Sequence, residues 1–243
     1  MPGQWLAAGE GRGQIAVAVQ PSRYEKGKMS QRRSSILLTG FGPFPGVPEN
    51  VTTRLVPKLA SLARRRWRGH HIEAAVLPTE WRAGPAAVAE LLDALKPAVV
   101  LHFGVARTSV RFTIESRGLN RARLITDAAG LLPPSGRLSL AGPDVLAASI
   151  PTARIIERLR RRSLPVSLSH DAGGYLCNAV LYGSLERALS AAWPMRSGFI
   201  HLPPALRDAA DVAPRRTAVR LDWDQALEGS LEILAATLGQ PVA

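Results

Sequence analysis

The chain has 243 residues, 46% of them hydrophobic, with 31 Lys and Arg against 19 Asp and Glu. That length and apolar content suffice for one sizeable buried core. A single cysteine excludes an internal disulfide framework, and the spacing of Cys and His excludes a zinc cluster of the usual kind. No apolar run approaches the ~20 residues that span a bilayer, so we expect no membrane partner. One cysteine suits a reducing compartment and predicts a cytoplasmic location, although a cysteine-poor secreted protein would have the same composition.

The formal net charge of +12 raises the question of a nucleic-acid partner. The arginines are nevertheless dispersed, and two clusters, at 64–66 and 158–162, fall where helices are expected to end. Cations at a helix C-terminus offset the helix dipole. Few aromatic residues lie among the arginines, as stacking on single-stranded bases would require. We therefore expect no nucleic-acid partner.

The first 33 residues differ in composition from the rest of the chain. They are Gly-rich and mixed in charge, without a sustained period of 2 or 3.6 residues. Such a composition predicts a disordered N-terminal extension over residues 1–33. Residues 34–243 are expected to form a single α/β domain.

From Ser35 onward, short apolar runs alternate with longer amphipathic stretches. Strands are predicted over residues 36–39, 72–77, 98–103, 166–169 and 198–201. Helices are predicted over about 51–66, 81–95, 152–162, 176–192 and 223–238. Residues 110–114 alternate weakly and predict an edge strand, whereas 120–143 are loop-rich. Asn50 is placed to cap the first helix, and Pro97 prevents the second from continuing.

Strands that alternate with helices predict an α/β fold, a three-layer α/β/α sandwich around a mostly parallel, mixed sheet. Ligands of such sheets gather at the carboxyl ends of the strands. Four segments with functional side chains fall at predicted strand ends: those after Leu38, Phe103 and Leu168, and His201 itself. The sequence therefore predicts one site at this edge of the sheet.

Cys177 is the first candidate for chemistry at that site. It stands just after Ala172-Gly173-Gly174, at the predicted start of a helix. Free backbone N–H groups and the positive end of the helix dipole favour a thiolate there, and the same groups can stabilise an oxyanion. The alternative is structural, because a lone cysteine in an apolar helix is commonly a small core residue.

A thiolate nucleophile needs a proton acceptor, usually a histidine. His201 ends a strand before a rigid Leu-Pro-Pro sequence and is a candidate general base, or else a hydrogen-bonded structural histidine. His170 competes with it, seven residues before Cys177. His102 lies inside a predicted buried strand and is expected to be structural. Glu115 could orient an imidazole or pair with a neighbouring arginine, and the local sequence favours the arginine.

These residues lie in segments that resemble a known family, pyroglutamyl peptidase I, also called pyrrolidone carboxyl peptidase, a cysteine peptidase. The resemblance covers about 35–207. The matching segments are Leu38–Phe44 with Asn50 after it, Thr113–Arg117, Ser169–Tyr182 and Gly198–Pro203.

The resemblance implies a role for each catalytic candidate. Cys177 would be the nucleophile, His201 the general base and acid, and Glu115 the group that orients His201. The implied reaction removes an N-terminal pyroglutamyl residue from a peptide and requires no metal or organic cofactor. Members of the family often form homo-oligomers, so a homo-oligomer is expected here too.

The implied pocket must recognise a neutral five-membered lactam. Aromatic and apolar side chains would form its walls, and polar groups would order it or bind the lactam amide. The residues expected there are Phe41, Phe44, Asn50, Thr79, Tyr175 and Leu176. The alternative for Phe41 and Phe44 is that they anchor their loop.

Several positions depart from the usual pattern of the family, among them Val51, Val105 and the residues after Pro203. None removes a catalytic residue, but each bears on substrate preference. Two alternatives therefore stay open: a related thiol hydrolase that acts on another blocked acyl group, and a non-catalytic basic binding protein with the same fold.

Overall fold

The computed structural model describes residues 34–206 and 221–240, so the predicted extension at 1–33 lies outside the described residues. Within these ranges, six strands form one sheet in the order β2-β1-β3-β8-β4-β7. The strands are β1 (Ser35–Phe41), β2 (His71–Leu77), β3 (Val99–Val105), β4 (Phe112–Glu115), β7 (Val166–Ser169) and β8 (Arg196–Leu202). The first three and β8 are parallel, whereas β4 runs antiparallel to β8 and carries β7 parallel beside it. The sheet is therefore mixed, as predicted.

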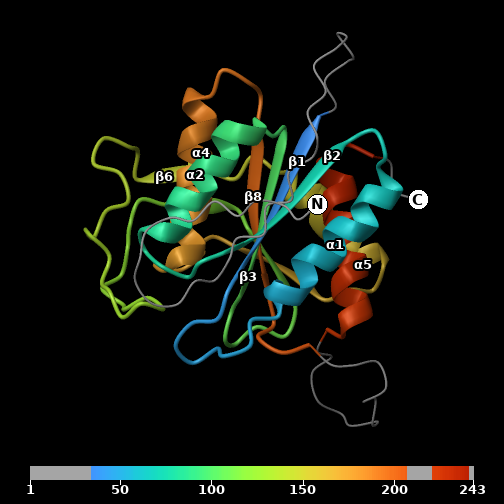
Figure 1. Ribbon diagram of the computed structural model, residues 1–243. Helices are drawn as coiled ribbons and strands as arrows, with labels where there is room; N and C mark the ends of the chain where they lie inside the picture. Colours follow the sequence, from blue (N-terminus) through green and yellow to red (C-terminus); the bar gives the residue numbers. More distant parts are fainter. Residues whose placement is uncertain (1–33, 207–220, 241–243) are drawn as a thin grey trace, which may run out of the picture.

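Helices cover both faces of this sheet, which confirms the three-layer arrangement (Figure 1). One face carries α1 (Thr52–Arg66), α3 (Thr152–Arg161) and α5 (Trp223–Thr237), and the other carries α2 (Ala83–Leu95) and α4 (Leu176–Ser190). Successive residues of β1 and β3 point to opposite faces, and both faces are buried. This double burial explains why the sequence of these strands is continuously apolar. None of the described helices is long and apolar enough to cross a membrane.

The prediction of an edge strand at 110–114 was wrong. The strand there, β4, lies between β8 and β7, and β7 is the edge. Phe112 and Ile114 pack into the core under α3 and α5, whereas Thr113 and Glu115 line a cavity on the other face. The alternation that suggested an exposed face thus reflects a polar cavity.

Two further strands were not predicted. β5 (Arg117–Leu119) and β6 (Val145–Ala147) form an antiparallel pair on either side of the loop-rich stretch. Each has three residues, too few for a period of 2 to be recognised in the sequence. The predicted helices are all present, with ends that differ by one or two residues.

His102 anchors the helix that carries Cys177 to the sheet. Its imidazole is fully buried in β3, with Nδ1 2.7 Å from Thr39 Oγ1 in β1 and Nε2 2.9 Å from Ser184 Oγ in α4. Burial lowers the pKa of His102 to about 3, so the ring is neutral at physiological pH. His102 is therefore the structural histidine that its strand predicted.

Replacing His102 with Gln is expected to flatten the pH dependence of stability. Below pH 6.5 the unfolded wild-type chain binds a proton that the folded state excludes until the pH approaches about 3. As the pH decreases from 6.5 towards 3, the free energy of unfolding of the wild type should therefore decrease, relative to that of the variant, by about 1.4 kcal/mol per pH unit. Urea unfolding of both proteins at neutral and successively lower pH measures this difference. Identical pH slopes would show that His102 does not resist protonation in the folded state.

Candidate active site

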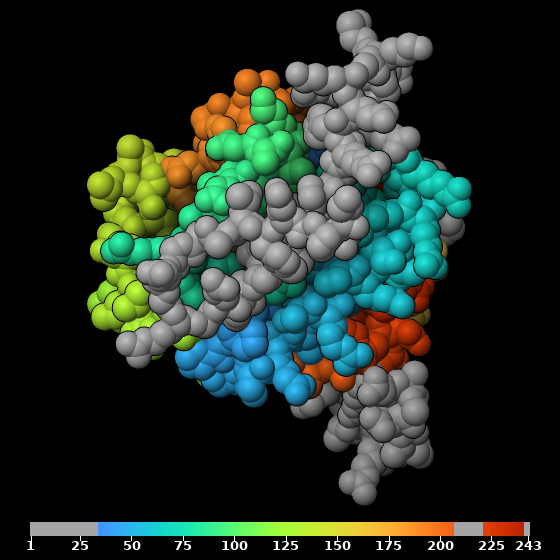
Figure 2. Space-filling model, in the orientation of Figure 1, coloured from blue at the N-terminus to red at the C-terminus, as the bar shows by residue number. Residues whose placement is uncertain are grey.

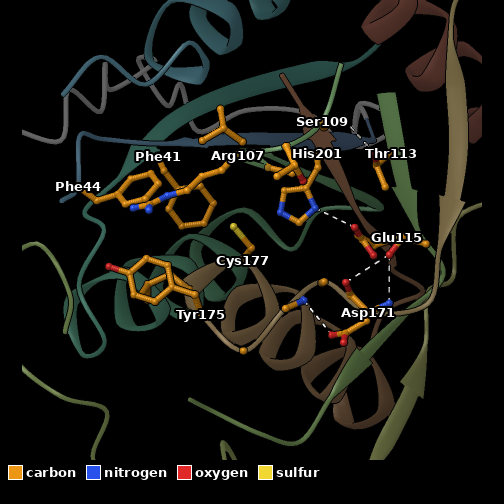
Figure 3. A pocket seen from close by; sticks show the side chains of 18 of the residues that line it. Phe41, Phe44, Arg107, Ser109, Thr113, Glu115, Asp171, Tyr175, Cys177 and His201 are labelled. Atoms are coloured by element: carbon orange, nitrogen blue, oxygen red, sulfur yellow. Dashed lines mark hydrogen bonds and ion pairs between the residues drawn. The ribbon is translucent and has the colours of Figure 1, made fainter. Parts of the chain in front are cut away.

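A cavity of about 880 Å³ opens at the carboxyl ends of β1, β3 and β8 (Figure 3). The catalytic and pocket residues that the resemblance implied all line it. These residues are Phe41, Phe44, Asn50, Thr79, Glu115, Tyr175, Leu176, Cys177 and His201. Parallel strands end at one edge of a sheet, so segments far apart in the sequence meet there.

Cys177 is the second residue of α4, and its sulfur faces the cavity (Figure 3). The preceding cap residue, Tyr175, is extended, no side chain caps the helix, and its first turn has no acidic residue. The positive end of the helix dipole and the N–H groups of the first turn therefore lie beside the thiol.

Gly104, near the end of β3, allows the sulfur to sit this close to the sheet. A Cβ atom at Gly104 would lie 3.1 Å from Cys177 Sγ and 2.7 Å from Phe199 Cζ. Both distances are shorter than ordinary contacts with carbon, so any larger residue would displace the thiol or the ring. The glycine is a steric requirement of the site.

The ring of His201, in β8, lies between Cys177 and Glu115 (Figure 3). Its Nδ1 is 2.8 Å from Glu115 Oε1, and both side chains are buried, at 7% and 1% exposure. The other carboxylate oxygen of Glu115, Oε2, is buried without a hydrogen-bond partner among the described residues. Glu115 thus contacts the histidine rather than the arginine that its local sequence favoured.

The surroundings of His201 favour its protonated form. Burial by itself lowers the pKa of the imidazole, but the charge of Cys177, its hydrogen bond to the ring, and the hydrogen bond and charge of Glu115 act in the opposite direction. Together they raise the pKa of His201 to about 9. A protonated imidazole beside a thiolate is the arrangement that activates a cysteine nucleophile.

His170, the competing histidine, is placed elsewhere. Its side chain is exposed, with Nδ1 2.5 Å from Ser116 Oγ, and its carbonyl accepts a hydrogen bond from Arg117 Nε. The histidine that lines the cavity next to Cys177 is His201.

Aromatic rings surround one end of the cavity. The ring centroids of Phe44 and Tyr175 are 5.8 Å apart, and Trp81 meets Tyr175 edge-on at 5.3 Å. Phe41 contacts Phe199, which in turn contacts the ring of His201. We call this the aromatic end.

Asn50 and Thr79 hold the loop that forms one wall of the aromatic end. The carbonyl of Gly42 accepts hydrogen bonds from Asn50 Nδ2 at 3.1 Å and from Thr79 Oγ1 at 2.9 Å. Asn50 Oδ1 also accepts the N–H of Thr52, the first residue of α1, so it satisfies a free donor there as a cap would. Leu176 differs from these residues, because its side chain is fully buried and packs in the core shared by α2 and α4.

The sequence did not identify the wall formed by residues 123–127. Ile125 and Thr126 line the cavity, and Trp81 Nε1 donates to the carbonyl of Ile125. Asp127 is buried and accepts hydrogen bonds from the N–H groups of Trp81, Ala129 and Leu131. Asp followed three residues later by Gly is a type I turn signal that could have located this anchor.

Arg107 was also missed. Its Nη2 donates to the carbonyl of Pro45 at 2.8 Å, which ties the loop after β3 to the loop after β1. Gly46 lies beneath the guanidinium, with a positive φ of 82° and no room for a Cβ.

Within residues 34–206 and 221–240, no cluster of three or more His, Cys, Asp or Glu is placed to hold a metal ion.

Comparison with known proteins agrees with this geometry. A family model described as pyroglutamyl peptidase matches residues 34–228. A pyrrolidone-carboxylate peptidase of Cupriavidus taiwanensis is 35% identical over 179 residues, covering 72% of this chain and 81% of that protein. One of Coprothermobacter proteolyticus is 32% identical over 207 residues, covering 84% and 99%.

Solved structures show the same fold. A mutant pyrrolidone carboxyl peptidase from Pyrococcus furiosus superimposes with a TM-score of 0.74 at 25% identity, covering 84% of this chain and 98% of that one. Pyroglutamyl peptidase I of Bacillus amyloliquefaciens gives a TM-score of 0.71 at 27% identity, covering 84% and 96%. The match of the family model over most of the chain, together with these relatives, shows that the chain belongs to the pyroglutamyl peptidase family, a family of cysteine peptidases.

Proposed function

We propose that this protein hydrolyses the bond between an N-terminal pyroglutamyl residue and the rest of a peptide, with Cys177 as nucleophile. His201 acts as general base and acid, and Glu115 orients His201. The observation that carries the proposal is the position of the His201 ring between the sulfur of Cys177 and a buried carboxylate. Membership of the family supports the same reaction.

The reaction proceeds by acyl transfer to sulfur. The Cys177 thiolate attacks the carbonyl carbon of the pyroglutamyl residue, and N–H groups at the start of α4 stabilise the oxyanion. The C–N bond then breaks as protonated His201 gives its proton to the leaving amine. A water molecule, deprotonated by His201, attacks the thioester, releases pyroglutamic acid and restores the thiol.

The aromatic end suits the pyroglutamyl ring. The ring is neutral, and the residue has no free amine that would need a carboxylate partner. Phe41, Phe44 and Tyr175 supply apolar surface, and Asn50 and Thr79 add polar side chains to the same walls. A site built around that amide loses hydrogen bonds when proline occupies it.

The protein is proposed to work in the cytoplasm, as a homo-oligomer and without a cofactor. A catalytic thiol must stay reduced, which supports this compartment. The segment 120–145 forms the yellow-green border at the left of Figure 2. It exposes Leu124, Leu131, Leu132 and Leu140, with Leu140 at 89% exposure. Exposed apolar surface of this kind supports contact between subunits.

Replacing Cys177 with Ala or Ser should abolish turnover without unfolding the protein. The side chain is small and only partly buried, so Ser or Ala should preserve the fold, whereas loss of a nucleophile typically costs at least about 1,000-fold in kcat. Release of aminomethylcoumarin from its pyroglutamyl conjugate measures activity, and thermal unfolding controls for the fold. Iodoacetamide should inactivate the wild type, and a chelator should not. A Cys177→Ala variant that still hydrolyses the conjugate would show that Cys177 is not the nucleophile.

The pH dependence of kcat/KM should have an alkaline limb set by His201. The active form needs the protonated imidazole, so activity should fall as the pH rises through about 9. In Glu115→Gln the carboxylate charge that raises the pKa of His201 is gone, so this limb should move to lower pH. Rate profiles of both proteins on the same conjugate test the shift. An alkaline limb that stays in place or moves to higher pH would show that Glu115 does not raise the pKa of His201.

Selectivity for the acyl group follows from the polar groups of the aromatic end. A prolyl conjugate lacks the lactam carbonyl, so it should be cleaved at least about 100-fold less efficiently than the pyroglutamyl conjugate. Parallel kcat/KM measurements should include an acetyl-amino-acid conjugate. Preference for that conjugate would indicate a thiol hydrolase for another blocked acyl group.

A further inference from the structure

The cavity has two unlike ends, which lie on opposite sides of Cys177 (Figure 3). Phe41, Phe44 and Tyr175 lie on one side, and Ser109, Thr113 and Glu115 lie on the other. We call the second side the hydroxyl end, because small hydroxyl side chains line it. They are Ser109, Thr113, Ser167 and Ser169.

The hydroxyls of this end lie close to one another. Ser109 Oγ is 3.4 Å from Thr113 Oγ1, which is 3.5 Å from Ser167 Oγ. Both contacts are long, so Thr113 and Ser167 retain capacity to hydrogen-bond a ligand, whereas Ser109 and Ser169 already donate to backbone carbonyls. Thr113 pairs directly with His201 across β4 and β8, which places the hydroxyl end next to the general acid.

The hydroxyl end is where the leaving peptide must lie. If the pyroglutamyl ring fills the aromatic end and its carbonyl carbon lies at the sulfur of Cys177, the leaving nitrogen faces His201. The residues that follow then continue past His201, away from the aromatic rings. This assignment rests on the proposed function.

Arg111 gives the hydroxyl end its charge. It directly precedes β4 and lines the cavity with an exposed side chain. Ser109 Oγ accepts the N–H of Arg111 at 3.3 Å and donates to its carbonyl at 2.8 Å, which fixes the backbone there. Among the described residues, no carboxylate forms an ion pair with Arg111.

The two carboxylates that line the cavity are already neutralised. Glu115 is hydrogen-bonded to His201, and Asp171 pairs with Arg121 at 2.6 Å and interacts with Arg123. Two other arginines line the cavity: Arg107 donates to the carbonyl of Pro45 at the aromatic end, and Arg123 interacts with Asp171. The charge left for a ligand at the hydroxyl end is therefore that of Arg111.

We propose that the hydroxyl end selects leaving peptides that begin with an acidic residue, and that Arg111 is the specificity-determining residue. The guanidinium attracts a carboxylate in the residue after the pyroglutamyl group, and it repels a lysine in the same place. The hydroxyls of Thr113 and Ser167 bind the peptide backbone irrespective of that side chain.

The experiment compares kcat/KM for peptides that differ only in the residue after pyroglutamate, which is Glu, Gln or Lys. At low ionic strength the wild type should prefer Glu over Lys by about fivefold or more, the size expected for one partly exposed charge pair. Arg111→Gln should bring this ratio close to one, and Arg111→Lys should keep most of it. The matched control is Arg65→Gln, which removes one exposed positive charge in the last turn of α1 and should leave the ratio unchanged.

Three results would overturn the proposal. The first is equal kcat/KM for the Glu and Lys peptides in the wild type, and the second is a Glu/Lys ratio that Arg111→Gln leaves unchanged. The third is a ratio that Arg65→Gln lowers as much as Arg111→Gln does, because the preference would then come from the net charge of +12. The proposed function is judged separately, by hydrolysis of the uncharged pyroglutamyl conjugate. A wild type that cleaves this conjugate but ignores the charge of the leaving peptide refutes only the role of Arg111.

Discussion

The site depends on one hydrogen bond, between His201 in β8 and Glu115 in β4, the two neighbouring strands that run antiparallel in the sheet. β4 runs antiparallel to β8, and Glu115 pairs with Phe199 while Thr113 pairs with His201. His201 and Glu115 are thus diagonal neighbours on one face, and long side chains can reach each other across that spacing. Hydrogen bonds to charged groups contribute about 1.5–3 kcal/mol. In this buried setting the bond also holds the ring at the angle that faces Cys177.

The second requirement is that α4 holds its first turn against that ring. Asn178, next to Cys177, accepts the N–H of Leu119 at 2.9 Å and donates to the carbonyls of Leu119 and Arg121. Further along the helix, Ser184 bonds to His102 in the sheet. Two polar anchors therefore fix the position and tilt of the helix, and Gly104 leaves room for the sulfur. Each anchor is buried, so its loss would leave an unsatisfied polar group as well as a loosened helix.

Much of the positive charge serves the fold. Arg158 is buried and pairs with Glu232 between α3 and α5, and Arg64 Nε donates to the carbonyl of Ile72. Arg196 Nη1 binds the carbonyl of Thr237 near the end of α5. Arginine suits such places because its planar group donates several hydrogen bonds and stays charged. The arginines that line the cavity, such as Arg111, are not part of these structural contacts.

The sequence by itself determined the alternation of strands and helices, because periodicity and apolar runs are local properties of the chain. It also placed Cys177 at a helix start and His201 at a strand end, since those positions follow from the same local patterns. Local patterns alone could not decide which histidine meets the thiol, and the choice of His201 came from the resemblance; His170 is nearer in sequence, but in the tertiary structure its ring lies at Ser116. Likewise, the local sequence favoured an arginine as the partner of Glu115, and the reversed strand β4 gave it His201 instead. Strand order and direction arise from pairings between distant segments, and no local pattern encodes them.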